Sequence, residues 1–160
     1  MNWQQVCADR SLQDLPYKIE LNREGLIVMA PAKSHHAVLQ GRIQRLLIRL
    51  LGERGEVIPE CPVETSEGVK VADVAWISPE RYESVKDQDA YRTAPELCVE
   101  VMSDSNSARE MQTKVRLYLE IGALEVWVCA PDGGIRFFDG SGERPSSALL
   151  PDFPSRVSAH

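Results

Sequence analysis

Two apolar, strand-like runs of this chain each carry one acidic residue in the middle. Asp73 lies in Lys-Val-Ala-Asp-Val-Ala-Trp-Ile at 70–77, and Glu100 lies in Leu-Cys-Val-Glu-Val-Met at 97–102. An unpaired carboxylate destabilises a core strand, because removing its charge from water is costly. Two such residues in neighbouring runs therefore predict a shared partner, and a divalent cation is the obvious one.

A lysine follows on the next predicted helix. This helix begins after the cap-rich stretch 103–107 and ends near Ile121, where Gly122 stops it. Its apolar stripe consists of Ala108, Met111, Val115 and Tyr118. Lys114 lies at the edge of that stripe, so we expect it to lean over the sheet rather than into water. Glu110 is four residues earlier and can pair with it.

This set of residues suits phosphodiester hydrolysis. Mg²⁺ binds through one or two carboxylates and keeps several waters, one of which can act as the nucleophile. A nearby lysine can orient or deprotonate that water, or neutralise the transition state. Structural interpretations stay open: Asp73 capping a strand end, Glu100 pairing with a buried arginine, and Lys114 as a surface lysine. His36 is either a site residue or simply a histidine at a helix start.

The remaining periodic segments predict the fold class. A hairpin is expected at 17–21 and 26–29, a helix at 36–51 with Ser34 as its N-cap, and a proline-interrupted edge strand at 56–63. Residues 78–95 are expected to form a loop that can include a short helical turn, and 124–129 with 135–138 are expected to form a last hairpin before a loop-like tail from 140. The helix after Glu100 is a crossover that can join parallel strands. The prediction is an α/β fold: a mixed central sheet flanked by helices, with N-terminal and C-terminal hairpins.

Composition sets broad limits. A chain of 160 residues with 43% hydrophobic and 26% charged residues predicts a single globular domain over 1–160. No apolar run is long enough for a membrane span, and residues 1–10 do not resemble a signal peptide. The four cysteines form no C-x-x-C pair, so zinc is not expected and a reducing cytoplasm fits. Residues 1–55 hold eight Lys/Arg against five Asp/Glu, whereas 56–160 hold ten against nineteen. This asymmetry is compatible with a metal site that a polyanion approaches.

Four motifs together resemble those of the Uma-two family of restriction endonucleases, which have the PD-(D/E)XK nuclease fold. They are Val-Ala-Asp73-Val, Pro-Glu-Leu-Cys-Val-Glu100-Val-Met-Ser, Glu110-x-x-x-Lys114-x-x-x-Tyr118 and Gly122-Ala-Leu-Glu-Val-Trp127, and the resemblance covers about 17–140. His36 also matches. Ala72 replaces a proline, Glu110 replaces an aspartate, and Met102 stands where the wider superfamily has its E-x-K lysine.

The resemblance implies a restriction-endonuclease-like domain that cleaves DNA with Mg²⁺, for which Mn²⁺ can substitute. Asp73 and Glu100 would be metal ligands, and the backbone carbonyl of Val101 would complete the shell. Lys114 would be the catalytic lysine, with Glu110 as its orienting partner. Cutting two strands calls for two sites, so a homodimer is compatible with this activity. Two alternatives remain: a non-catalytic DNA-binding module of defence or transposon systems that keeps the fold, and a metal-dependent hydrolase of smaller phosphate esters.

Overall fold

A six-stranded mixed sheet forms the centre of the computed structural model, which describes residues 1–31 and 33–157. Its strand order is β3-β4-β5-β6-β7-β8, and a separate two-stranded sheet pairs β1 with β2. The strands are β1 (Tyr17–Leu21), β2 (Ile27–Pro31), β3 (Glu56–Thr65), β4 (Gly68–Ile77), β5 (Leu97–Val101), β6 (Glu125–Cys129), β7 (Ile135–Asp139) and β8 (Gly142–Arg144). The helices are α1 (Trp3–Ala8), the 3₁₀ turn η1 (Arg10–Leu12), α2 (Ser34–Leu51), α3 (Pro79–Val85) and α4 (Ala108–Glu120). The predicted α/β class is confirmed.

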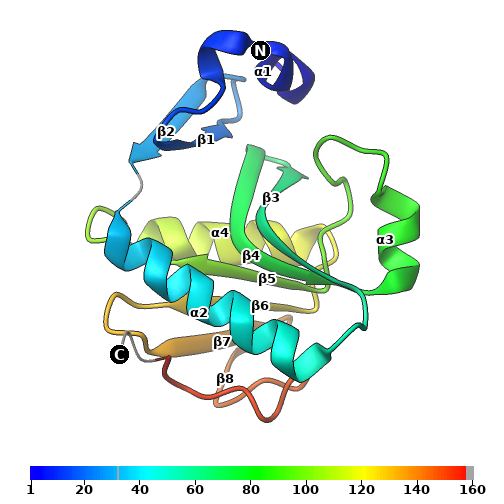
Figure 1. Cartoon of the computed structure of the whole chain (residues 1–160), viewed down its shortest axis with the longest axis vertical. Helices are drawn as coiled ribbons and strands as arrows, with labels where there is room; N and C mark the ends of the chain where they lie inside the picture. The colour runs from blue at the N-terminus through cyan, green and yellow to red at the C-terminus, as the bar shows by residue number, and fades with distance from the viewer. Residues whose placement is uncertain (32, 158–160) are drawn as a thin grey trace.

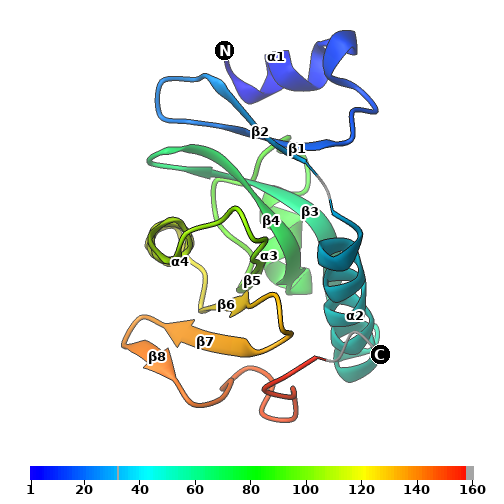
Figure 2. The same ribbon diagram turned by 90° about the vertical axis from the view of Figure 1, so that its left-hand side faces the viewer.

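Helices cover the two faces of the central sheet, α2 on one side and α4 on the other (Figures 1 and 2). The alternation along β5 explains this arrangement. Leu97, Val99 and Val101 belong to the core that includes the buried stripe of α2, whereas Cys98 packs with the residues of α4. As predicted, α4 is a crossover, because β5 and β6 pair in parallel.

Two local predictions need correction, and one segment holds elements that were not predicted. The N-cap of α2 is Lys33, without a side-chain hydrogen bond, and Ser34 is already helical. The tail after Gly140 is not all loop, because a third strand, β8, pairs with β7 and extends the C-terminal hairpin. The segment before Tyr17 contains α1 and η1, which the sequence had not indicated. These elements are only three to six residues long, too short for a periodic pattern to show.

The N-terminal hairpin β1–β2 lies beside the start of β4 rather than within the central sheet (Figure 1). The turn between β3 and β4 lies against it. Gly68 has a φ of +96°, and a Cβ at that position would collide with the backbone carbonyl of Leu21. Leu21 and Val69 also share a small apolar cluster with Val6 of α1. Glycine here therefore permits the close approach that brings β1 to β4.

No helix among the described residues is long and apolar enough to cross a membrane.

Candidate functional site

Asp73 and Glu100 come together where β4 and β5 separate. The antiparallel ladder between these strands runs Trp76–Leu97, Ala75–Cys98 and Val74–Val99 and stops there. The next two positions are Asp73 and Glu100, which on this register lie opposite each other on one face. Their side chains are only 1% and 2% exposed. The opening of the ladder thus places two buried carboxylates side by side.

The pairing of β3 with β4 is also interrupted at this point, at Glu60. Glu60 has a φ of 54°, which is uncommon for a residue other than glycine, and the β3–β4 pairing passes from Pro59 to Cys61. The carbonyl of Asp73 instead accepts a hydrogen bond from the Gln40 side chain at 2.7 Å. That same amide donates to Glu60 at 2.8 Å. Gln40 of α2 therefore holds the backbone of Asp73 in place.

Lysine side chains neutralise the carboxylate pair. Lys114 Nζ lies 3.4 Å from Glu100 Oε1, and its side chain is 15% exposed, so it leans over the sheet as expected rather than into water. Lys18 of β1 lies between the two carboxylates, with Nζ 3.1 Å from Asp73 Oδ1 and 3.4 Å from Glu100 Oε2. The predicted residues Asp73, Glu100 and Lys114 thus converge, but a second lysine joins them.

The partner of Lys114 differs from the sequence expectation. Within the described residues Glu110 makes no ion pair with Lys114; its carboxylate accepts from the Asn106 side chain at 3.2 Å and is exposed. Glu20 of β1 takes that place, with Oε2 2.9 Å from Lys114 Nζ. The same oxygen accepts from the backbone N–H of Val71 at 2.7 Å, which fastens β1 to β4. Glu110 remains on the rim of the same cleft.

Sequence reasoning missed Lys18 and Glu20. They alternate with Ile19 and Leu21 along β1, a pattern typical of a hairpin with one solvated face. Nothing local indicates that this polar face meets the opening of another sheet. The only available signal was that two residues of opposite charge share that face.

The remaining carboxylate oxygens have fixed donors. Asp73 Oδ2 accepts from the backbone N–H of Val101 at 2.7 Å and lies 3.4 Å from His36 Nε2. Glu100 Oε1 accepts from the Tyr118 hydroxyl at 2.7 Å. His36, at the start of α2, is therefore near the site, and Tyr118 contributes its hydroxyl to Glu100 besides its place in the apolar stripe.

The charges shift the pKa of each group. Burial opposes ionisation of Asp73, but Lys18 and His36 outweigh it and lower the pKa of that carboxyl. For Glu100 burial dominates over Lys114 and Lys18, with Asp73 and Glu20 adding to it, and raises the pKa to about 7. Burial opposes the ammonium of Lys18 as well, but Glu100, Asp73 and Glu20 together raise its pKa. Such a separation of two neighbouring carboxyl pKa values is typical of functional sites.

These residues line a cleft of about 720 Å³ between the N-terminal hairpin, the sheet and the starts of α2 and α4. Six of its lining residues are acidic and two are lysines: Asp14, Glu20, Glu60, Asp73, Glu100 and Glu110, against Lys18 and Lys114. The cleft is therefore negative in sum. Such a cleft repels an anionic substrate unless cations offset part of the negative charge.

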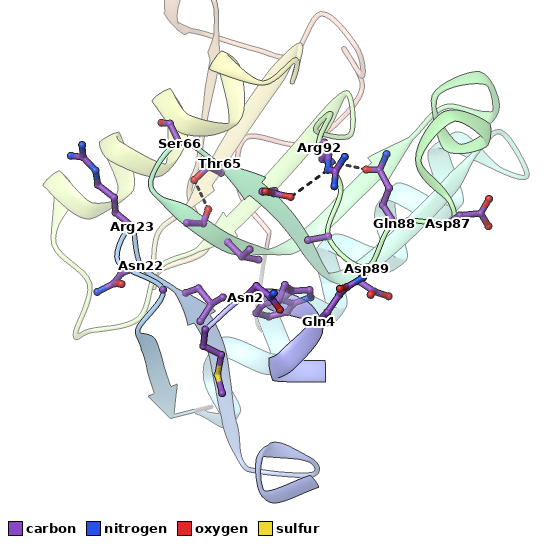
Figure 3. Close-up of a pocket in the computed structure, with 18 residues that line it drawn as sticks. Asn2, Gln4, Asn22, Arg23, Thr65, Ser66, Asp87, Gln88, Asp89 and Arg92 are labelled. Atoms are coloured by element: carbon purple, nitrogen blue, oxygen red, sulfur yellow. Dashed lines mark hydrogen bonds and ion pairs between the residues drawn. The ribbon is translucent and has the colours of Figure 1, made fainter. Parts of the chain in front are cut away.

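A second cavity, of about 590 Å³, lies where the turn of the N-terminal hairpin, the start of the chain, the β3–β4 turn and the segment 87–92 meet (Figure 3). The polar side chains around it include Asn2, Arg23, Asp89 and Arg92, and Arg92 lies 3.6 Å from Glu64. The buried carboxylates of the sheet do not line this cavity. The chemistry indicated by the sequence belongs to the first cleft.

The donor set around Asp73 and Glu100 fits one hard cation. Among the described residues no group of three or more His, Cys, Asp or Glu side chains gathers as a metal cage. Two carboxylates are nevertheless the usual protein contribution to a Mg²⁺ site, with water completing the shell. The ammonium of Lys18, held between both carboxylates, shows that this point favours positive charge.

The fold has a nuclease-like α/β architecture. The crystal structure of a protein from Anabaena variabilis ATCC 29413, described as a putative nuclease belonging to DUF820, superposes with a TM-score of 0.71 over 88% of this chain and 87% of that one, at 14% identity. A comparison with curated proteins finds no match.

The sequence matches the Uma2 family, described as "putative restriction endonuclease", over residues 8–135. The chain belongs to this family, as its motifs had indicated.

Proposed function

We propose that this protein is a Mg²⁺-dependent endonuclease that hydrolyses DNA phosphodiester bonds in the cleft beside β1. The observation that supports it most is the convergence of Asp73 and Glu100 at the point where β4 and β5 part, with Lys114 3.4 Å from Glu100. Membership of a family described as restriction endonucleases supports DNA as the substrate.

Asp73 and Glu100 would hold the cation, and the backbone carbonyl of Val101 is the third candidate ligand. When bound, such a cation supplies an acidified water and offsets charge on the phosphate. The fixed donors to the outer carboxylate oxygens, Val101 N–H on Asp73 and the Tyr118 hydroxyl on Glu100, orient the two ligands.

Lys114 would act at the scissile phosphate. Its ammonium contacts Glu20 and Glu100 on the wall of the cleft, so it is preorganised beside the place where negative charge develops. A preorganised donor of this kind stabilises a transition state without reorganisation during the reaction. Glu20 is the positioning residue for Lys114.

Incubation of the purified protein with supercoiled plasmid, single-stranded DNA and a small phosphodiester, each with Mg²⁺, Mn²⁺ or EDTA, tests this proposal. We expect metal-dependent cleavage of DNA that Asp73→Asn abolishes. Glu83→Gln is the matched control, because Glu83 is an exposed carboxylate paired with Lys86 outside the cleft. Cleavage that persists in EDTA or in Asp73→Asn would contradict the proposal, and turnover of the small ester alone would favour a phosphoesterase.

A further inference from the structure

The two carboxylates of the site each leave one oxygen to Lys18. Asp73 Oδ2 is bound by the Val101 N–H, and Glu100 Oε1 is bound by the Tyr118 hydroxyl and Lys114. Among the described residues, Asp73 Oδ1 and Glu100 Oε2 have Lys18 Nζ as their hydrogen-bond partner, at 3.1 and 3.4 Å. The two oxygens that face each other thus share one ammonium.

A divalent cation would need the same two oxygens. Mg²⁺ and Ca²⁺ bind carboxylate oxygens at roughly 2.0–2.6 Å, so an ion that bridges both carboxylates has to enter the gap where the Lys18 ammonium lies. Two positive charges cannot share that gap, because their repulsion in a poorly hydrated site is large.

We propose that Lys18 is an internal counter-ion that occupies the cation position of the metal-free protein, and that a divalent cation binds by displacing it. This inference rests on the proposed metal site and adds the Lys18 ammonium as a competitor of the metal for the two carboxylates. The side chain is 17% exposed toward the cleft, and Glu20, 3.9 Å from Nζ, is the partner that remains after displacement. The N-terminal hairpin would therefore lower the affinity of the site for metal while stabilising the empty site.

Mn²⁺ titration by calorimetry of the whole chain tests the exchange. Lys18→Met keeps the length of the apolar stem and removes the competing charge, so we expect Mn²⁺ to bind about tenfold more tightly or better. Lys18→Arg keeps the charge and is expected to stay within about threefold of the parent. Lys86→Met is the matched control, since it removes an exposed lysine outside the cleft.

A second variant covers the case in which Lys18→Met fails to fold without its ion pair. Lys18→Gln retains donors for both carboxylates but carries no charge, and it should also bind Mn²⁺ more tightly than Lys18→Arg. Equal or weaker binding by the folded neutral variant overturns the competition. Absence of Mn²⁺ binding in every variant overturns the metal site along with it. If the neutral variants bind Mn²⁺ more tightly but the protein does not cleave DNA, the exchange of Lys18 for metal is supported and only the nuclease activity is contradicted.

Discussion

Two buried carboxylate sites of this protein satisfy their charge in different ways. Glu125 in β6 is 5% exposed and accepts hydrogen bonds from four neutral donors: Trp127 Nε1, Ser147 Oγ and the backbone N–H groups of Ala148 and Leu149, at 2.6–2.9 Å. Asp73 and Glu100 are instead balanced by the ammonium groups of Lys18 and Lys114.

We interpret this difference as that between a structural carboxylate and the carboxylates proposed to bind a metal. The donors to Glu125 are an indole within the same strand and a fixed turn at 147–149, so they lock the C-terminal segment against the sheet. Lysine ammonium groups lie on long flexible stems, and these two line an open cleft. A carboxylate neutralised in this way can exchange its partner for a metal or a substrate.

The largest expected effect is on cleavage. Asp73→Asn should lower the rate of DNA hydrolysis by about a thousandfold or more, because charge stabilisation at a preorganised site is commonly the largest catalytic term. Glu125→Gln should keep kcat within a few-fold, because neither Glu125 nor its four hydrogen-bond donors line the cleft. Initial rates on plasmid DNA measure both. An equal loss of cleavage rate in the two variants would show that the two carboxylate sites do not differ in function.

The next effect is on stability. Glu125→Ala leaves an indole N–H, a hydroxyl and two backbone N–H groups buried without their acceptor, so the free energy of unfolding should fall by about 3 kcal/mol. Glu143→Ala, which removes an exposed carboxylate paired with Arg136, should leave the free energy of unfolding nearly unchanged. Urea denaturation compares them. If the free energy of unfolding of Glu125→Ala falls only slightly, water replaces the carboxylate as acceptor and Glu125 does not hold the C-terminal segment against the sheet.

Lys114 comes third. Lys114→Ala should slow cleavage about a hundredfold while the protein still binds Mn²⁺, because the lysine supplies charge at the phosphate and is not a ligand. Lys86→Ala, at an exposed position outside the cleft, is the control. Parental cleavage by Lys114→Ala would mean that the lysine serves only to neutralise Glu100 and Glu20.

A further expected effect is a pH dependence of stability in the metal-free protein. Glu100 has a pKa raised from 4.5 to about 7, so the native state binds its proton more tightly than the unfolded chain does. The contribution of Glu100 to the free energy of unfolding is fully present below pH 4.5 and is lost as the pH rises toward 7. Denaturation of Glu100→Gln across this range should show a flatter profile than the parent. An identical slope in both proteins would assign the pH dependence to other groups, such as His36, whose pKa the contact with Asp73 raises.

The location of each site residue in the fold also explains which of these residues the sequence could predict. Asp73, Glu100 and Lys114 were found because each lies in a strand or helix whose period fixes the direction of its side chain. Lys18 and Glu20 were not found, because they lie on a hairpin whose position depends on contacts distant in sequence, such as Gly68 against Leu21. The Glu110 pairing was expected from helix spacing alone, and Glu20 takes that position on Lys114 in the structure. Local patterns thus predicted Asp73, Glu100 and Lys114, but not the β1 residues Lys18 and Glu20 that pair with them.

The most direct test of the account is the position of Mn²⁺ in crystals of the protein, located by anomalous scattering. We expect one peak between Asp73 Oδ1 and Glu100 Oε2, with the Lys18 ammonium moved away from both oxygens, and no peak there in Asp73→Asn. Crystals soaked in saturating Mn²⁺ that keep Lys18 between the two carboxylates and show no peak at that point would contradict the account.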